Sequence, residues 1–184
     1  MKKKRSISNA VPPNLRELNS LFWRNYALQI DDYRVEEESV EYNAAHIQVK
    51  EKRIVFRTGK ITPKKKGMFV TLWKRDKNGN TIPYHKNDPI DLVIVETKKS
   101  DRIGFFIFNK KILTEKRIIS NEKEGKRGFR IYPPWEKTNN AQAAKSQLWQ
   151  SLYFFENQRA SQEDRLRFLE FTGLKEGEST SKRL

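Results

Sequence analysis

The residues most able to do chemistry lie in one strand-like stretch. The sequence DLVIVETK contains Asp91, Glu96 and Lys98. Many nucleases use a strand Asp followed by Glu-x-Lys to hold Mg²⁺ and to orient a water molecule at a phosphodiester. Carboxylate oxygens suit Mg²⁺, and a nearby ammonium group stabilises developing negative charge. A magnesium-dependent nuclease with a Glu96-x-Lys98 site is therefore one candidate function.

The spacing of the two acidic residues argues against that nuclease. Side chains alternate across a sheet, so Asp91 and Glu96 would face opposite sides of one continuous strand. They would also lie roughly 16 Å apart at about 3.3 Å per residue. They could share an ion only if a bulge intervened or another acidic residue replaced Asp91. We expect an ordinary strand end with exposed charges, and the nuclease stays an alternative.

Other catalytic groups are scarce in this sequence. Cysteine is absent, which excludes disulfides, zinc ribbons and thiol nucleophiles. His46 and His85 are far apart in the sequence and have no carboxylate at metal-ligand spacing, so we predict no metal site and no cofactor. No serine lies in a G-x-S-x-G turn, and GKITPKKKG does not have the phosphate-loop pattern. The sequence favours a binding protein over an enzyme.

Positive charge is concentrated in the middle of the chain. The 184 residues carry a net charge of +15, and residues 51–137 hold 23 basic and ten acidic side chains. No acidic residue lies between Glu51 and Asp76. A surface that only promotes solubility would mix both signs along the chain. A segregated block instead destabilises a compact protein through self-repulsion unless a polyanion relieves it.

This basic block also contains aromatic residues, a mixture typical of nucleic-acid-binding proteins. Lys and Arg neutralise phosphates and release counterions, while aromatic side chains add shape recognition. The pattern does not separate DNA from RNA, and an acidic protein is an alternative partner. An anionic membrane fits less well, because the cations lie on strands and loops. The predicted nucleic-acid-binding residues are Arg57, Lys60, Lys64, Lys65, Lys66, Trp73, Lys74, Arg75, Lys126, Arg127 and Arg130.

A block of strands must position these residues. From Tyr42 to about Tyr132 apolar residues recur with a period of two, which predicts six or seven strands. In GMFVTLWKR, the side chains of Met68, Val70 and Leu72 would pack inward. The preceding loop, TGKITPKKKG, would then remain in water with its ammonium groups clustered.

Apolar residues with helical spacing occur before the strand block and also within it. Leu15, Leu18 and Phe22 predict an N-terminal helix, with Asn14 as its candidate cap. Asn109 is expected to open a short helix over KKILTEK.

Two further helices are expected near the C-terminus. Asn139 followed by Gln142 has the spacing of a reciprocal cap, and so has Ser161 followed by Asp164. Gly173 is the expected end of the second helix. The side chains predicted to form the apolar faces of these helices are Leu148, Leu152, Phe155, Leu166, Phe168 and Leu169.

Strands gathered in one block between helices indicate an α+β fold, either an open β pseudobarrel or a mixed or antiparallel sheet of six to seven strands. Residues 13–173 would form a single domain, between a flexible basic tail at 1–12 and a disordered tail at 174–184. The acidic residues 31–42 would form a linker outside the core or neutralise part of the basic face. No secretory signal and no apolar run of membrane length are present, which predicts a cytoplasmic protein with no membrane partner.

Five stretches in this order resemble the MepB family of bacterial proteins. They are FRTGKITPKKKGMFVTLWKR, DPIDLVIVE, GFFIFNKKILTEKRIIS, GKRGFRIYPPWEK and QAAKSQLWQSLYF, and the similarity spans about residues 13–156. The resemblance implies a fold similar to the DNA-recognition pseudobarrels of restriction endonucleases and plant transcription factors, which grip the major groove. The family pattern includes no Glu-x-Lys motif, which further weakens the nuclease hypothesis. The positions through which the resemblance implies DNA contact are Arg57, Lys60, Lys64, Trp73, Lys74, Arg75, Lys126, Arg127 and Arg130.

Overall fold

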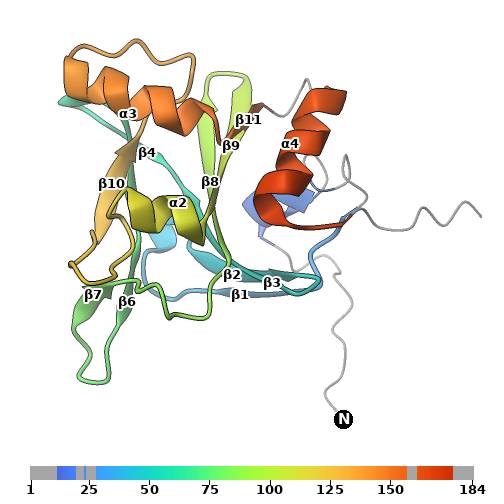
Figure 1. Ribbon diagram of the computed structural model, residues 1–184, viewed down its shortest axis with the longest axis vertical. Helices are drawn as coiled ribbons and strands as arrows, with labels where there is room; N and C mark the ends of the chain where they lie inside the picture. Colours follow the sequence, from blue (N-terminus) through green and yellow to red (C-terminus); the bar gives the residue numbers. More distant parts are fainter. Residues whose placement is uncertain (1–11, 20–22, 24–27, 157–160, 176–184) are drawn as a thin grey trace, which may run out of the picture.

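A computed structural model describes residues 12–19, 23, 28–156 and 161–175 of the chain, and these residues form an α+β fold (Figure 1). Its helices are α1 (Pro13–Glu17), η3 (Val40–Tyr42, a 3-10 helix), α2 (Lys110–Glu115), α3 (Ala141–Ser151) and α4 (Gln162–Thr172). Its strands are β1 (Asp32–Val35), β2 (Ala45–Val49), β3 (Lys52–Thr58), β4 (Lys60–Thr62), β5 (Lys65–Thr71), β6 (Trp73–Arg75), β7 (Thr81–Pro83), β8 (Leu92–Lys99), β9 (Arg102–Asn109), β10 (Gly128–Ile131) and β11 (Phe154–Glu156).

The strands form one large mixed sheet and two small sheets. The six-stranded sheet has the order β1-β2-β3-β8-β9-β11, in which β3 and β8 are parallel and the other neighbours are antiparallel. A three-stranded sheet has the order β10-β5-β4, and β6 and β7 pair as a hairpin. The predicted mixed sheet is therefore confirmed, and the strands of the described residues do not close into a barrel.

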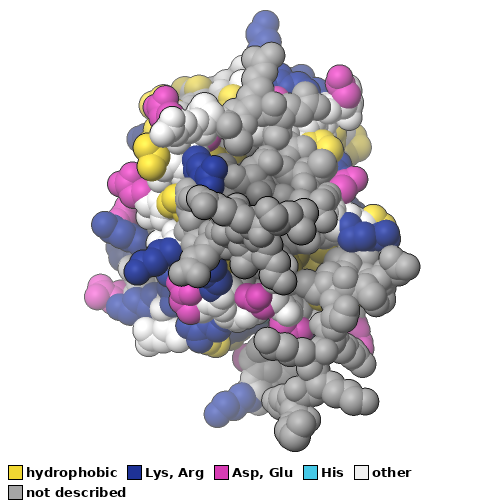
Figure 2. Space-filling model, turned by 90° about the vertical axis from the view of Figure 1, so that its right-hand side faces the viewer, with side chains coloured by type: hydrophobic (Ala, Val, Ile, Leu, Met, Phe, Trp, Pro, Cys, Tyr) yellow, Lys and Arg dark blue, Asp and Glu magenta, His cyan; other side chains and the backbone are white. Residues whose placement is uncertain are grey.

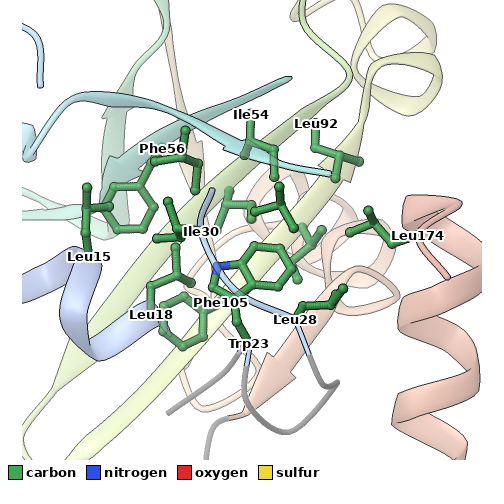
Figure 3. Close-up of a cluster of buried hydrophobic side chains, with 14 of the residues drawn as sticks. Leu15, Leu18, Trp23, Leu28, Ile30, Ile54, Phe56, Leu92, Phe105 and Leu174 are labelled. Atoms are coloured by element: carbon green, nitrogen blue, oxygen red, sulfur yellow. The ribbon is translucent and has the colours of Figure 1, made fainter. Parts of the chain in front are cut away.

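The large sheet separates two hydrophobic cores, because alternate residues of its strands face opposite sides. Ile54 and Phe56 of β3 face the first core, where Trp23 and Phe168 of α4 also pack. Figure 3 shows the tight convergence of this cluster, with Phe56 and Trp23 among the labelled side chains. Val55, between Ile54 and Phe56, faces the second core instead. The period of two predicted for the strand block is therefore confirmed in β3.

The second core lies between the large sheet and a layer made of the three-stranded sheet, α2 and α3 (Figure 1). Met68, Val70 and Leu72 are fully buried in it, as the alternation in their strand predicts. Ile112 and Leu113 anchor α2 on the same core. The stretch predicted as a loop, residues 58–67, instead contains β4 and the start of β5, although Lys64, Lys65 and Lys66 are exposed as expected.

Three helix boundaries agree with the sequence patterns. Asn109 caps α2 by accepting a hydrogen bond from the backbone N–H of Ile112. Ser161 and Asp164 form a reciprocal capping box at the start of α4, and Gly173 ends this helix in the left-handed conformation.

The other helix caps differ from the predictions. Pro12, not Asn14, precedes α1, and Asn14 is buried within the helix. Asn140, not Asn139, caps α3, because its side chain accepts from the N–H of Ala143. Phe22 lies outside the described residues.

The predicted apolar faces of the C-terminal helices were partly wrong. Leu148, Leu152 and Leu166 are 76%, 59% and 63% exposed. Helix α3 instead buries Ala143 and Gln150, so its inner face is narrow and partly polar. Phe155 is buried as predicted, but it belongs to β11 and not to a helix.

The predicted tails lie largely outside the described residues. Leu174, which the sequence patterns assign to the C-terminal tail, is 3% exposed and packs in the first core. The packed part of the chain therefore reaches one residue beyond the predicted boundary at 173.

Candidate nucleic-acid interface

A basic groove lies between the β4–β5 turn and helix α3, beside β10. Helix α3 and β10 are at the upper left of Figure 1. The volume of the groove is about 570 Å³. None of the described residues that line it is Asp or Glu. Its cationic lining residues, referred to here as the groove cations, are Lys64, Lys65, Lys66, Lys116, Lys126 and Arg130.

The first wall is the lysine turn, a name used here for the β4–β5 turn together with the first residues of β5 (residues 63–67), and its backbone is held in place. Gly67 has a φ of +75°, and a Cβ at this position would lie 2.6 Å from the carbonyl oxygen of Ile131. Only glycine fits both the left-handed conformation and this close approach. The guanidinium of Arg130 donates to the carbonyl oxygens of Lys66 and Gly67, at 3.1 and 3.3 Å. Arg130 therefore positions the lysine turn in addition to contributing charge.

Helix α3 forms the opposite wall, and Gln150 fastens it to β10. The N–H of Tyr132 donates to Gln150 Oε1 at 2.8 Å, and Gln150 Nε2 donates to the carbonyl oxygen of Arg130 at 2.9 Å. Gln150 is only 2% exposed, so water does not compete for these bonds. The two walls of the groove thus share the backbone around Arg130.

An aromatic side chain lies at the groove surface of α3. Trp149 is half-buried and packs against Phe108, with 5.5 Å between the ring centroids. The ammonium of Lys116 lies over the Trp149 ring, 5.4 Å from its centroid. The groove therefore offers an aromatic surface together with its cations.

The lysines of the groove are not neutralised by neighbouring carboxylates. Within the described part of the chain, no ion pair involves Lys64, Lys65, Lys66 or Lys126. These four side chains are exposed. Clustered cations without counter-charges raise the local positive potential, which attracts anions.

Arg57 does not belong to this groove, although its sequence position suggested a binding role. It is 1% exposed, and its Nη2 lies 3.0 Å from Glu36 Oε1. His46 Nε2 lies 2.9 Å from the same oxygen. Burial raises the pKa of Glu36, but the hydrogen bond with His46 and the charge of Arg57 outweigh that effect and hold the pKa below its ordinary value. Arg57 is therefore a buried structural cation that cannot reach a phosphate in this conformation.

Carboxylates of the acidic segment also pair with other predicted cations. Lys60 Nζ lies 2.6 Å from Glu41, and the guanidinium of Arg75 forms two-pronged hydrogen bonds with Glu38. Together with the pair between Glu36 and Arg57, these contacts neutralise three basic residues. The acidic segment is therefore not a linker, because residues 32–35 form β1 of the large sheet, and its carboxylates pair with basic residues that lie outside the groove.

The remaining predicted residues also lie outside the groove. Lys74 pairs with Asp88, and Arg127 lies 3.2 Å from Glu124. Trp73 lines a different hollow of about 480 Å³ together with Lys74 and Arg75. Of the eleven residues predicted to bind nucleic acid, the groove brings together five: Lys64, Lys65, Lys66, Lys126 and Arg130.

The candidate nuclease residues are separated. Asp91 Oδ2 accepts from the backbone N–H of Arg53 at 2.8 Å, whereas Glu96 Oε2 accepts from Thr58 Oγ1 at 3.1 Å. Glu96 is 1% exposed, so the expectation of an exposed charge was wrong there. Burial raises its pKa, although Lys98 at 3.3 Å opposes that shift. The described residues contain no group of three His, Asp or Glu that could hold a metal ion.

Sequence reasoning missed several polar residues of the groove. Lys116 follows α2, while Gln142 and Ser146 lie on α3. Gln142, Ser146 and Trp149 are spaced by four and then three residues, which places them on one helix face. That spacing is visible in the sequence, but the exposed leucines beside it suggested a different face.

Comparison with known proteins places these features in a family. The family model described as MepB-like matches residues 36–156, which include every groove cation. The chain belongs to the MepB-like family. A solved structure titled "Crystal Structure of MepB" is similar to it, with a TM-score of 0.69 and 30% identity over 82% of this chain and 100% of that one. A search of curated proteins found no match. In this MepB-like chain, none of the described helices has the length and apolar character needed to cross a membrane.

Proposed function

We propose that this MepB-like protein is a cytoplasmic, non-enzymatic nucleic-acid-binding protein with duplex DNA as its ligand. The observation that carries the proposal is the groove itself. Six cations from separate parts of the chain line it, and its described lining residues include no carboxylate. Such a site is costly to the free protein and is relieved by a polyanion.

The distribution of the groove cations suits a phosphate backbone better than a single small anion. Lys64 lies on the β4–β5 turn, Lys65 and Lys66 begin β5, Lys116 follows α2, and Lys126 precedes β10. Ammonium groups spread over several elements can neutralise successive phosphates and release their counterions. Backbone contacts of this kind set affinity and position without reading sequence.

The other lining residues favour nucleic acid over an acidic protein. Gln142 and Ser146 present polar side chains, and Trp149 presents an aromatic ring, on the wall opposite the lysine turn. Amide and hydroxyl groups bond to the phosphates and sugars of a duplex, and aromatic rings stack on bases that are not paired. An acidic protein segment would use the cations but would leave this wall without a matching partner.

Charge reversal of the lysine turn tests the proposal. We expect K64E/K65E/K66E to reduce binding to a fluorescently labelled DNA duplex by at least about a hundredfold, because three phosphate contacts become repulsive. Anisotropy titration at constant salt measures the change. The matched control, K77E/K111E/K123E, has the same net charge and changes exposed lysines outside the groove, so it should retain most of the binding.

Equal loss of binding in both triple variants would show that net charge alone attracts DNA, which contradicts the proposed groove. Heparin and polyglutamate serve as competitors of the labelled duplex. If polyglutamate displaces the duplex from the protein at the same charge concentration as DNA, an acidic protein partner would be favoured. Plasmid incubated with the protein and Mg²⁺ should remain uncut, and cutting that is lost in E96A would overturn the non-enzymatic part of the proposal.

A further inference from the structure

We infer that the groove seats an unpaired nucleotide, so that the protein prefers a DNA duplex with a single-stranded extension over a blunt duplex. The inference rests on the proposed function and specifies the form of its ligand. It depends on the size of the groove, on the lysines of one wall and Trp149 of the opposite wall, and on the polar side chains that share the helix face of Trp149.

The size of the groove matches one nucleotide rather than a duplex. Its volume of about 570 Å³ falls in the range of sites that enclose small organic molecules. The bases of a duplex point inward and pair with each other, so only phosphates and sugars could enter such a site. An unpaired nucleotide can place its base and its phosphate in the groove together.

The two walls offer different chemistry to such a nucleotide. The first wall carries Lys64, Lys65 and Lys66, whose ammonium groups suit a phosphate. The second wall carries Trp149, whose ring suits a base. Phosphate and base lie on opposite ends of a nucleotide, so one unit can contact both walls.

The ring of Trp149 is held in place by its neighbours, so a base can stack on it without a large loss of side-chain entropy. Its ring packs against Phe108 and Tyr153, with centroid distances of 5.5 and 6.3 Å, which limits its motion. The cation over its ring, Lys116, is exposed and bears a flexible side chain. A base could displace this ammonium from the ring, and the ammonium could then pair with a neighbouring phosphate.

Polar side chains on α3 complete the site. Gln142 and Ser146 line the groove on the same helix face as Trp149. An amide has both donors and an acceptor, and a hydroxyl has one donor and accepts as well. These groups can bond to the exposed edge of an unpaired base, an edge that is occupied in a duplex.

Binding to three DNA ligands tests the inference. They are a blunt duplex, the same duplex with a short single-stranded extension, and a longer blunt duplex with the same total number of phosphates. We expect the wild-type protein to bind the extended duplex roughly tenfold more tightly than either blunt duplex, because base stacking is added. Equal affinity for the extended and the phosphate-matched blunt duplex would overturn the inference.

Variants of Trp149 separate stacking from structural effects. W149L should remove the preference for the extension, whereas W149F, which keeps an aromatic ring, should retain most of it. L148A changes the neighbouring residue, which is 76% exposed and does not line the groove, and should behave as wild type. Retained preference in a folded W149L variant would contradict the role of the ring.

The outcomes also separate this inference from the proposed function. Salt-sensitive binding of all three ligands with equal affinity would sustain DNA binding and reject the unpaired-nucleotide site. Absence of binding to every ligand would reject both. A quench of fluorescence on adding the extended duplex, present in wild type and absent in W149F, would place the base at Trp149.

Discussion

The triad of Arg57, Glu36 and His46 shows how one residue can mislead sequence reasoning. Arg57 lies in the most basic stretch of the chain, yet its side chain is 1% exposed and bonded to Glu36. Its Nη1 also donates to the carbonyl oxygen of Phe56 at 2.8 Å. A buried cation needs such partners, because an unpaired charge in the interior is strongly destabilising.

Glu36→Gln should therefore destabilise the protein in a pH-dependent way. At about pH 7 the free energy of unfolding should fall by about 3–5 kcal/mol, since Arg57 would lose its buried counter-charge. The pKa of Glu36 is held below its ordinary value of 4.5, so the stabilisation is present above that pH and is lost as the pH falls through the folded-state pKa. Urea unfolding of both proteins at several pH values measures the difference.

The control is Glu38→Gln, which removes the same charge from the exposed pair with Arg75. It should leave the unfolding midpoint close to wild type, because exposed ion pairs contribute little. A difference between E36Q and wild type that stays constant down to about pH 3 would contradict the assignment.

At the scale of elements, the β4–β5 turn determines whether the lysines face the groove. The pairing of β4 with β5 is irregular after Ile61, and Gly67 then takes a positive φ. Arg130 from β10 holds the backbone of the turn from one side. The backbone conformation of the turn thus depends on a residue of β10 that lies more than 60 residues away in the sequence.

Substitution of Gly67 should damage both stability and binding. G67A should lower the free energy of unfolding by more than about 2 kcal/mol, because strain at positive φ adds to a collision with the Ile131 carbonyl. Thermal unfolding and DNA titration provide the measurements. In G79A, the glycine has a φ of +83° but nothing within 4 Å of the added Cβ, so only the strain of about 1 kcal/mol should appear. Equal losses in the two variants would show that the close approach at Gly67 does not matter.

At the scale of the whole molecule, charge is distributed unevenly between surfaces. Figure 2 shows the face that carries α4, on which basic and acidic side chains are interspersed. Pairs such as Arg167 with Asp164, at 2.7 Å, belong to this end of the chain. The groove lies beside α3 and β10 instead, and acidic residues are absent from its described lining. The molecule thus keeps a concentrated positive surface despite many internal ion pairs.

The dependence of binding on salt follows from this surface. With six groove cations, the slope of log K against log salt for a duplex should be about −5, since each phosphate contact contributes about −0.9. K65A should reduce the steepness by about 1. Titrations at four or more salt concentrations give both slopes. A slope near zero would be incompatible with phosphate contacts as the source of affinity.

Much of the fold could be predicted, because strand alternation and capping are local. The opposite faces of Ile54 and Val55, the cap at Asn109 and the stop at Gly173 all follow from residues close in sequence. The exposure of Leu148 and Leu152 could not be predicted, since a helix with apolar residues on several sides needs a neighbour to select its buried face. Helix α3 meets β10 through Gln150, a polar residue that composition does not single out.

The sequence by itself determined the block of positive charge, the division into a central block of strands with helices before, within and after it, and the resemblance to the MepB family. Only the tertiary structure decided which cations remain free. Glu38 and Arg75 are 37 residues apart, and Glu41 and Lys60 are 19 apart, yet each pair is in contact. Lys64, Lys65 and Lys66 instead line an open groove together with Lys116 and Lys126. Coulombic pairing acts through space, so it depends on which strands are neighbours in the sheet. The spacing of residues along the chain does not reveal that order.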